Sequence, residues 1–304
     1  VSTILEGKAE IVNNYDWMKD YTYLEFLRDI GKYINVNYML AKDIINRRLE
    51  TGITYAEFSY TLLQGYDFLH LYKEKNCILQ AAGSDQWGNI TTGIELIKKI
   101  EGKEAYGFTM PLILDANGNK FGKSEGNALW LDINETSSYE LYQYLINSDD
   151  TKVEEYLKVY TFLTKEEIEE IMDKHNKEPH LRIAQEKLAQ EFITDLHGEK
   201  EYQNAKTISD ALFKNNIKDL TDKQIEDAFK GVPKYKQQDN QTLIEILTEN
   251  KIASSRREAR EFLINNAITV NGDIINDENY IINNNRKYNI IRKGKKKYYI
   301  IEKN

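Results

Sequence analysis

Residues 54–89, which read TYAEFSYTLLQGYDFLHLYKEKNCILQAAGSDQWGN, decide the expected fold of the first half of the chain. Thr54 followed three residues later by Glu57 is a capping box, which predicts the start of a helix. The run Cys77–Ala82 is expected to be a buried strand, and a glycine turn then leads into a second helix over Ile90–Ile100. This order of elements is typical of an open α/β sheet, where ligands bind beyond the carboxyl ends of the strands.

One face of the first predicted helix carries polar side chains. At about 100° per residue, Tyr60, Gln64 and Asp67 fall on the same side, and Asp67 is the only charge between Phe58 and Leu69. A phenol, an amide and a carboxylate on an otherwise apolar helix predict a site that grips a small polar ligand. The spacing alone leaves a second interpretation open, in which Asp67 caps a neighbouring element and the loop after the strand is only a turn.

The glycine turn after the strand adds polar groups of its own. Gly83 allows close approach of the backbone to a ligand. Asp85 offers a hydrogen-bond acceptor, and Gln86 offers an amide. Because this turn joins the carboxyl end of a strand to the N-terminus of a helix, where free N–H groups collect, we expect it to contact a ligand.

A second loop, residues 120–127, combines glycine with basic side chains. Its polar residues of interest are Lys120, Lys123 and Ser124. Ammonium groups on such a loop can approach phosphate oxygens during a phosphoryl or nucleotidyl transfer. A P-loop is disfavoured because three residues separate Gly118 from Gly122, whereas a P-loop requires four. A solvated lysine loop without a function remains the alternative.

The composition limits the classes of protein to consider. A chain of 304 residues is expected to contain two or three domains. No apolar run approaches the roughly 20 residues of a membrane helix, and the first residues do not resemble a signal peptide, so we expect no membrane association. The single cysteine, Cys77, favours a reducing compartment, either the cytoplasm or an organellar matrix. Four scattered histidines have no zinc-site spacing, and no protein-bound metal is expected.

The second half of the chain divides into a helical region and a basic region. Residues 137–230 are highly charged and have predicted N-caps at Ser137 or Ser138, Thr164 and Thr221. Residues 241–304 contain two amphipathic helices and a hairpin signal at Asn271-Gly272. The basic side chains of this region are Arg256, Arg257, Arg260, Arg292, Lys293, Lys295, Lys296 and Lys297, with Tyr288, Tyr298 and Tyr299 interleaved near the end. Basic groups alternating with aromatics favour RNA binding over a solubilising tail.

Taken together, these motifs resemble the bacterial and organellar type of tyrosyl-tRNA synthetase, a family of class I aminoacyl-tRNA synthetases. The resemblance extends over essentially the whole chain, and the run Gly83–Asn89 followed by the lysine loop is its most specific part. It implies an α/β fold with a partial Rossmann-like parallel-sheet catalytic domain. The implied domains are a portion of the catalytic domain over 1–134, an all-α anticodon-side domain over 135–232, a linker over 233–240, and a small α+β S4-like RNA-binding domain over 241–304.

The resemblance also implies roles for individual residues. Tyr60 and Gln64 would bind the α-amino group of tyrosine, and Asp67 would accept the phenolic O–H. Gln86 would face the carboxylate side. Five residues would contact the nucleotide: Gly83 and Asp85 at the ribose, the backbone of Leu112 and Ile113 beside adenine, and Lys123. The residues Lys120, Lys123 and Ser124 would form a mobile loop that stabilises the departing pyrophosphate.

The implied reaction is tyrosine–tRNA ligation. L-Tyrosine would be adenylated by ATP with Mg²⁺, and the tyrosyl group would then pass to the 3′ end of tRNA(Tyr). Members of this family are homodimers, which would place a subunit interface in the region of residues 20–56. No membrane partner is implied.

The sequence departs from the family pattern in two places. None of its four histidines lies in a His-x-Gly-His signature, so we expect the chain to be an N-terminally truncated fragment that is inactive by itself. Ala82 stands where a second glycine is usual. Two alternatives stay open: a non-catalytic RNA-binding protein derived from a synthetase, and a related synthetase for another amino acid such as tryptophan.

Overall fold

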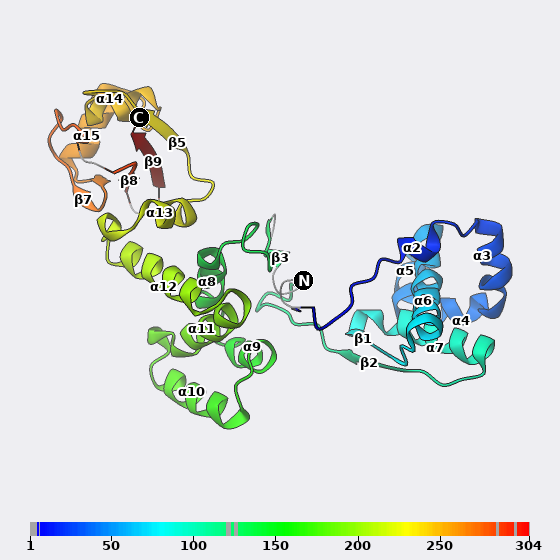
Figure 1. Cartoon of the computed structure of the whole chain (residues 1–304). Coiled ribbons are helices and arrows are strands. Elements are labelled where there is room, and N and C mark those ends of the chain that lie inside the picture. The colour runs from blue at the N-terminus through cyan, green and yellow to red at the C-terminus, as the bar shows by residue number, and fades with distance from the viewer. Residues whose placement is uncertain are drawn as a thin grey trace. The chain divides into compact units, whose positions relative to one another are not determined.

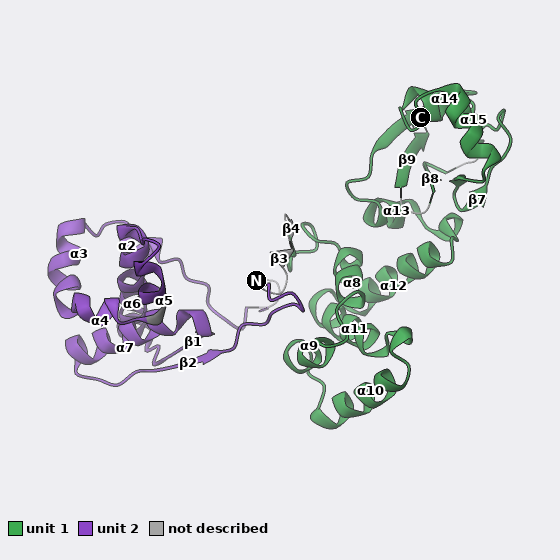
Figure 2. Cartoon of the chain, turned by 180° about the vertical axis from the view of Figure 1, so that it is seen from behind, with its two compact units in different colours: residues 1, 122–304 green, residues 2–121 purple. Residues whose placement is uncertain are grey.

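The computed structural model describes residues 5, 7–119, 123–124, 127–283, 286–294 and 297–303. The chain forms two compact units, one of residues 2–121 and one of residues 122–304 together with residue 1 (Figure 2). The boundary between the units lies upstream of residue 134, where the catalytic portion is expected to end. Each unit has its own hydrophobic core.

Helices dominate the unit of residues 2–121 (Figure 1). Its elements are α2 (Tyr15–Met18), α3 (Tyr23–Asp29), α4 (Val36–Leu40), α5 (Asp43–Leu49), α6 (Tyr55–Lys75), β1 (Leu79–Gly83), α7 (Trp87–Glu101) and β2 (Tyr106–Met110), with short 3₁₀ helices at Gly31–Tyr33 and Ser84–Gln86. The predicted start of α6 is confirmed: the Thr54 side chain accepts from the N–H of Glu57, whose side chain accepts from the N–H of Thr54. The helix ends at Asn76, which adopts the left-handed conformation with a φ of 53°.

Helices α6 and α7 pack closely because glycines lie where they meet. A Cβ atom on Gly93 would lie 2.9 Å from the Cβ and Cδ1 atoms of Phe68. A Cβ atom on Gly65 would lie 3.0 Å from Cγ2 of Thr92. Apolar side chains of both helices, among them Leu69, join those of α3 and α4 in one core. This contact fixes the polar face of α6 relative to the start of α7.

Strands β1 and β2 pair in parallel, from Leu79 with Tyr106 to Gly83 with Met110. The expected strand over Cys77–Ala82 therefore begins two residues later, at Leu79. Strand β2 ends at Met110, directly before Pro111, which has no N–H to donate to a further strand hydrogen bond.

The expectation that β1 is buried is wrong, because one face of the sheet is open to solvent. Helix α7 covers the opposite face so closely that a Cβ atom on Gly107 would lie 2.4 Å from Cγ2 of Ile90. Side chains on the open face, including Leu79, Phe108 and Met110, are about half exposed. Among the described residues this sheet has only two strands, so alternate side chains have no covering layer.

The unit of residues 122–304 begins with the short antiparallel pair β3 (Lys123–Ser124) and β4 (Asn127–Ala128) and continues as helices. These helices are α8 (Ser138–Ile146), α9 (Val153–Tyr160), α10 (Lys165–Lys177), α11 (Ile183–His197), α12 (Glu199–Phe213) and α13 (Asp222–Ala228), with 3₁₀ helices at Pro179–Leu181 and Ile217–Asp219. Capping boxes at Thr164 and Thr221 confirm the predicted helix starts. Of the two serines considered for α8, Ser137 is the N-cap.

A five-stranded mixed sheet follows, in the order β5-β9-β8-β6-β7. Its elements are β5 (Lys234–Gln237), α14 (Leu243–Glu249), α15 (Arg256–Ile264), β6 (Ile268–Val270), β7 (Asp273–Ile274), β8 (Tyr288–Lys293) and β9 (Lys297–Lys303). The predicted hairpin at Asn271-Gly272 is confirmed: both residues have positive φ, at 51° and 99°, and join β6 to β7.

The segment 233–240 does not behave as the expected linker. Its residues 234–237 form β5, which pairs in parallel with β9, from Lys234 with Ile300 to Gln237 with Lys303. Ile225 of α13 also shares a buried cluster with Ile290 and Ile300 of the sheet. The proline and the polar residues of this segment are typical of a linker. Its pairing partner, β9, lies some sixty residues later in the chain, so no local sequence pattern indicates the strand.

The α/β fold class is confirmed, with a parallel sheet in the first unit and a mixed sheet in the second. Within the described residues, none of the helices has the length and apolar character needed to cross a membrane.

Candidate active site

The carboxylate of Asp67 is bound by two donors from the N-terminal segment. The Nδ2 atom of Asn14 donates to Oδ2 over 3.1 Å, and the indole Nε1 of Trp17 donates to Oδ1 over 2.9 Å. The Trp17 ring also stacks on His70, with the ring centroids 4.4 Å apart and the planes at 18°. Because Asp67 and His70 are three residues apart on α6, one indole contacts both. Asp67 therefore carries a fixed, partly buried carboxylate.

The phenol beside this carboxylate is kept protonated. Burial, followed in size by the negative charge of Asp67, raises the pKa of Tyr66 above its ordinary value. The ring of Tyr66 packs edge-on against Phe26, with the centroids 5.7 Å apart. Tyr66 thus contributes packing rather than charge to this side of the helix.

Two glutamine side chains meet at one buried amide. The Nδ2 atom of Asn89, on the first turn of α7, donates to Oε1 of Gln64 over 2.9 Å and to Oε1 of Gln86 over 3.0 Å. Gln64 comes from α6, and Gln86 ends the 3₁₀ turn after β1. The close packing of α6 on α7 brings these two amides together although they are far apart along the chain.

Tyr60 lies one turn before Gln64 and is 59% exposed. It lines a cavity of about 470 Å³ together with Thr61, Ile53 and Asn89. Arg48, which pairs with Glu57 over 3.1 Å, lies on the same cavity. Tyr60 and the buried amide of Asn89 therefore border one space.

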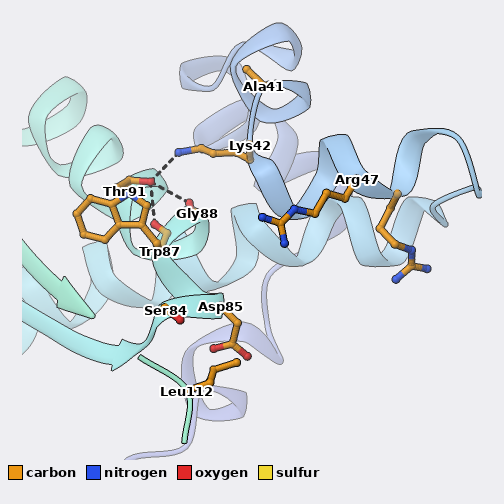
Figure 3. A pocket seen from close by; sticks show the side chains of 10 residues that line it. Ala41, Lys42, Arg47, Ser84, Asp85, Trp87, Gly88, Thr91 and Leu112 are labelled. Carbon is orange, nitrogen blue, oxygen red and sulfur yellow. Dashed lines mark hydrogen bonds between the residues drawn. The ribbon is translucent and has the colours of Figure 1, made fainter. Parts of the chain in front are cut away.

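A larger cavity of about 710 Å³ lies beside the glycine turn. Figure 3 shows Ser84, Asp85 and Leu112 on one side of it, with Lys42 and Arg47 across from them. Acidic and apolar groups thus lie on one wall and cations on the other. Such a cavity can accept a ligand that has a flat apolar part, hydroxyl groups and an anionic group.

Gly83 is required by the close approach of the two chain segments at this cavity. A Cβ atom there would lie 2.9 Å from Oδ1 of Asp85 and 3.1 Å from Cδ2 of Leu112. Any larger residue would push the segment around Leu112 away from β1. This geometry explains why position 83 of the turn is a glycine.

The ammonium group of Lys42 is fixed rather than free. Its Nζ atom lies 2.6 Å from Oγ1 of Thr91 and 2.7 Å from the Tyr38 hydroxyl, 4.0 Å from the centre of that ring. Thr91 in turn donates to the carbonyl oxygens of Trp87 and Gly88 (Figure 3). The cation is thus held at the start of α7.

The structure brings the predicted residues together in two groups. One group joins Gln64 to Gln86 through Asn89, and the other joins Gly83, Asp85 and Leu112. Asp67 lines neither of the two cavities, and Ile113 is half-buried beside Leu112 without lining them. Lys120, Lys295 and Lys296 lie outside the described residues, and of Lys123 and Ser124 only the backbone of β3 is described.

Four contributing residues were not assigned a role from the sequence: Asn14, Trp17, Lys42 and Asn89. Asn14 and Trp17 lie in a stretch that reads as a turn with an aromatic anchor, and Asn89 ends the run Gly83–Asn89. Their partners on α6 are 25 to 53 residues away. No periodicity within one element signals such contacts.

The predicted RNA-binding side chains differ in how far they are free to bind. Arg256, Arg257 and Arg260 lie on α15 with exposed side chains, each beside a glutamate at 3.5, 3.2 and 2.6 Å respectively. Lys297 is exposed at the start of β9, whereas Arg292 is half-buried. The Nζ atom of Lys293 donates to the Ile252 carbonyl over 2.7 Å and lies 4.1 Å from the centre of the Phe262 ring.

Comparisons with known proteins agree with this architecture. The family model of class I tRNA synthetases (W and Y) matches residues 2–214, and the model of the SYY-like C-terminal domain of tyrosine–tRNA ligase matches residues 224–301. The tyrosine–tRNA ligase of Bacillus pumilus is 48% identical over 304 residues, with 97% of this chain and 72% of the relative covered. That of Streptococcus agalactiae serotype Ia is 47% identical over 302 residues, with the same coverage.

The chain is also similar to two solved structures of mitochondrial tyrosyl-tRNA synthetases. A C-terminally truncated mitochondrial tyrosyl-tRNA synthetase from Aspergillus nidulans matches with a TM-score of 0.56 and 37% identity, covering 66% of this chain and 57% of that one. Its counterpart from Coccidioides posadasii matches with a TM-score of 0.54 and 34% identity, covering 64% and 56%.

The parallel strands, the glycine turn at their carboxyl ends and the first family match define a class I aminoacyl-tRNA synthetase. Both matched segments and the identity to the curated relatives narrow the class further. The chain belongs to the tyrosine–tRNA ligase family, whose members are aminoacyl-tRNA synthetases of protein biosynthesis, and it spans 72% of the length of the curated relatives.

Proposed function

We propose that the protein activates L-tyrosine with ATP and transfers the tyrosyl group to tRNA(Tyr), with the residues of α6, the glycine turn and the C-terminal sheet in the roles given below. The observation that carries the proposal is the Asp67 carboxylate, which two N–H donors orient on the same helix face as Gln64. A ligand with a phenolic O–H at one end and a zwitterion at the other suits this face.

On the amino-acid side, Asp67 accepts the phenolic O–H of tyrosine. Each of its oxygens already accepts one hydrogen bond and keeps further lone pairs for a third donor. Tyr60 and Gln64 bind the α-amino group, and Gln86 faces the carboxylate. A ligand without the hydroxyl would leave the Asp67 carboxylate without this partner, so phenylalanine would bind more weakly.

On the nucleotide side, the larger cavity receives ATP. Gly83 and Asp85 contact the ribose, and the backbone of Leu112 and Ile113 lies beside adenine. The loop residues Lys120, Lys123 and Ser124 stabilise the pyrophosphate as it leaves. Preorganised charges of this kind lower the barrier of a transfer reaction mainly by electrostatics and positioning. Mg²⁺ enters with the ATP phosphates, and we assign it no protein ligands.

The C-terminal region binds tRNA through its exposed cations. The proposed contacts are Arg256, Arg257, Arg260, Arg292, Lys293, Lys295, Lys296 and Lys297. Within this set the structure favours Arg257 and Lys297, whose side chains are exposed, over Lys293, whose ammonium already has a carbonyl partner.

We also propose that the protein is a homodimer of the cytoplasm or an organellar matrix. Large apolar or aromatic side chains are exposed within residues 20–56, among them Tyr23, Leu24, Val36 and Tyr55. The hydroxyls of Tyr23 and Tyr55 lie 2.7 Å apart, which joins α3 to the start of α6 in one surface. Exposed apolar patches of this kind mark interaction surfaces.

The test is amino-acid-dependent ATP–pyrophosphate exchange by the complete protein. We expect exchange with tyrosine and not with tryptophan, followed by charging of tRNA(Tyr). The Asp67→Asn variant should raise KM for tyrosine about tenfold or more, because a hydrogen bond to a charged group is lost. The Asp16→Asn variant on α2 is the control. Absence of tyrosine-dependent exchange, or an unchanged KM in Asp67→Asn, would reject the proposal.

A further inference from the structure

We propose that Asn89 is a positioning residue that sets the amide orientation of both glutamines at the tyrosine site. Its side chain is only 4% exposed and lies on the first turn of α7. One atom, Nδ2, donates to Oε1 of Gln64 and to Oε1 of Gln86. The inference rests on the proposed contacts of these two glutamines with tyrosine.

The two hydrogen bonds use both hydrogens of one primary amide. These hydrogens lie in the plane of the amide at fixed angles, so the two acceptor oxygens are held in set directions. Each glutamine therefore points its oxygen at Asn89 and its nitrogen away from Asn89. A side chain that only accepts hydrogen bonds would impose the opposite orientation on both.

The orientation matters because the two ends of a glutamine amide recognise opposite charges. The nitrogen of Gln86 stays available as a donor, which suits a carboxylate. The oxygen of Gln64 keeps a second lone pair, which suits an ammonium group. Rotation of either amide by half a turn would present an acceptor to the carboxylate or a donor to the ammonium.

Asn89 cannot follow a rotated glutamine because its own position is fixed. The neighbouring Ile90 is fully buried and contacts the backbone at Gly107 of β2. One turn further along α7, Gly93 packs directly on Phe68 of α6. The loss of the Asn89 amide should therefore weaken recognition of the amino-acid zwitterion while leaving the nucleotide cavity intact.

The test compares Asn89→Asp and Asn89→Leu with the wild type in the complete protein, by tyrosine-dependent ATP–pyrophosphate exchange. The aspartate has the same shape but accepts hydrogen bonds, and the leucine has a similar size without polar atoms. We expect KM for tyrosine to rise about tenfold or more in both variants. KM for ATP should stay within about twofold, and the fraction of active sites should be unchanged.

The matched control is Thr92→Val, on the same helix. Thr92 is fully buried and donates to the Gly88 carbonyl over 2.9 Å, so its loss tests destabilisation of α7 alone. A merely structural role for Asn89 predicts that all three variants lose active sites and keep the wild-type KM. That result would overturn the inference.

Two glutamine variants separate this inference from the function on which it rests. If Gln64→Ala and Gln86→Ala leave KM for tyrosine unchanged, the proposed substrate contacts are wrong. If they raise KM while a folded Asn89→Asp or Asn89→Leu protein keeps the wild-type KM, only the positioning role is wrong. If either Asn89 variant fails to fold, the other decides, and direct tyrosine binding by calorimetry replaces KM.

Discussion

The indole N–H of Trp17 donates to the Asp67 carboxylate over 2.9 Å while the same ring stacks on His70. The donor comes from the four-residue helix α2, fifty residues upstream of its acceptor. A short helix with no buried side chain of its own thus orients the proposed acceptor of the substrate hydroxyl.

Removal of this donor should weaken tyrosine binding without removing the stack. In Trp17→Phe the ring remains and the N–H is lost, so Asp67 keeps only its bond to Asn14. We expect KM for tyrosine to rise about tenfold, the effect of about 1.5 kcal/mol for a hydrogen bond to a charged group. Pyrophosphate exchange measures it. The exposed Tyr15 of α2 gives the control Tyr15→Phe, and an equal KM in both variants would contradict the prediction.

The contact between α6 and α7 predicts different losses of stability when two of its glycines are replaced. Gly93→Ala should lower the free energy of unfolding by about 1–3 kcal/mol, because the new methyl would lie 2.9 Å from two atoms of Phe68. Gly65→Ala is slightly less crowded, because its methyl would lie 3.0 Å from Cγ2 of the buried Thr92 and 3.2 Å from the backbone nitrogen of Gly93, and the better helix propensity of alanine offsets part of this crowding. We expect this second variant to be destabilised less than Gly93→Ala. Urea unfolding followed by circular dichroism distinguishes them, and equal destabilisation would contradict the argument.

The helical region contains a half-buried carboxylate whose contribution to stability should depend on pH. Glu186 accepts hydrogen bonds from the hydroxyls of Tyr142 at 2.5 Å and Tyr202 at 2.7 Å, and from Lys206. Burial opposes its ionisation, but the bonds from Lys206 and the two tyrosines outweigh it, and the pKa of Glu186 lies below its ordinary value. Burial, followed by the bond to Glu186, raises the pKa of both tyrosines, which therefore stay protonated as donors.

A lowered carboxyl pKa stabilises the fold above the ordinary pKa, and this contribution is lost as the pH falls through the lower folded value. Glu186→Gln should therefore reduce the free energy of unfolding by about 1.5–3 kcal/mol at neutral pH. The difference from the wild type should shrink below about pH 4. Urea unfolding across this range is the measurement, and Glu170→Gln, an exposed partner of Lys174, should change little. A difference that does not depend on pH would show that ionisation is not involved.

The C-terminal sheet should need residues before 241 to be stable. A fragment of residues 221–304 retains β5, which pairs with β9, and α13, whose Ile225 packs in one buried cluster with Ile290 and Ile300. A fragment of residues 241–304 exposes these two side chains, each worth about 1.5–3 kcal/mol when buried. We expect the longer fragment to unfold cooperatively in urea and the shorter one to be largely unfolded. Equal stability would mean that the domain begins at residue 241.

Replacement of the exposed Arg257 and replacement of Lys293, whose ammonium is hydrogen-bonded within the domain, should have different effects on tRNA binding. Arg257→Ala should weaken binding and reduce the dependence of log K on log salt by about one, because an exposed phosphate contact is lost. Lys293→Ala should instead destabilise the domain, because its ammonium is bound to the Ile252 carbonyl and the Phe262 ring. Filter binding across a salt series tests both, and an equal change of slope would contradict the distinction.

Local rules were enough to predict much of the fold. The capping boxes at Thr54, Thr164 and Thr221 and the hairpin at Asn271-Gly272 depend on residues within four positions of one another, so the sequence signals them directly. The shared face of Tyr60, Gln64 and Asp67 follows from helical geometry in the same way.

What the sequence did not reveal depends on contacts between distant segments. The partners of Asp67 lie 53 and 50 residues away, and β5 pairs with a strand some sixty residues later. The exposed face of β1 had no signal either, because an apolar run indicates a strand but not how many layers cover it.

The glycine contact between α6 and α7 has a mechanical consequence. Because Gly93 of α7 packs directly on Phe68 of α6, the two helices cannot slide past each other and should move as a single rigid block. The side chains proposed to bind the amino acid either lie on α6, as Tyr60, Gln64 and Asp67 do, or are hydrogen-bonded to α7, as Gln86 is through Asn89. Any opening or closing of the site during turnover must then come from movement of the surrounding loops, while the proposed tyrosine-binding side chains keep their positions relative to one another.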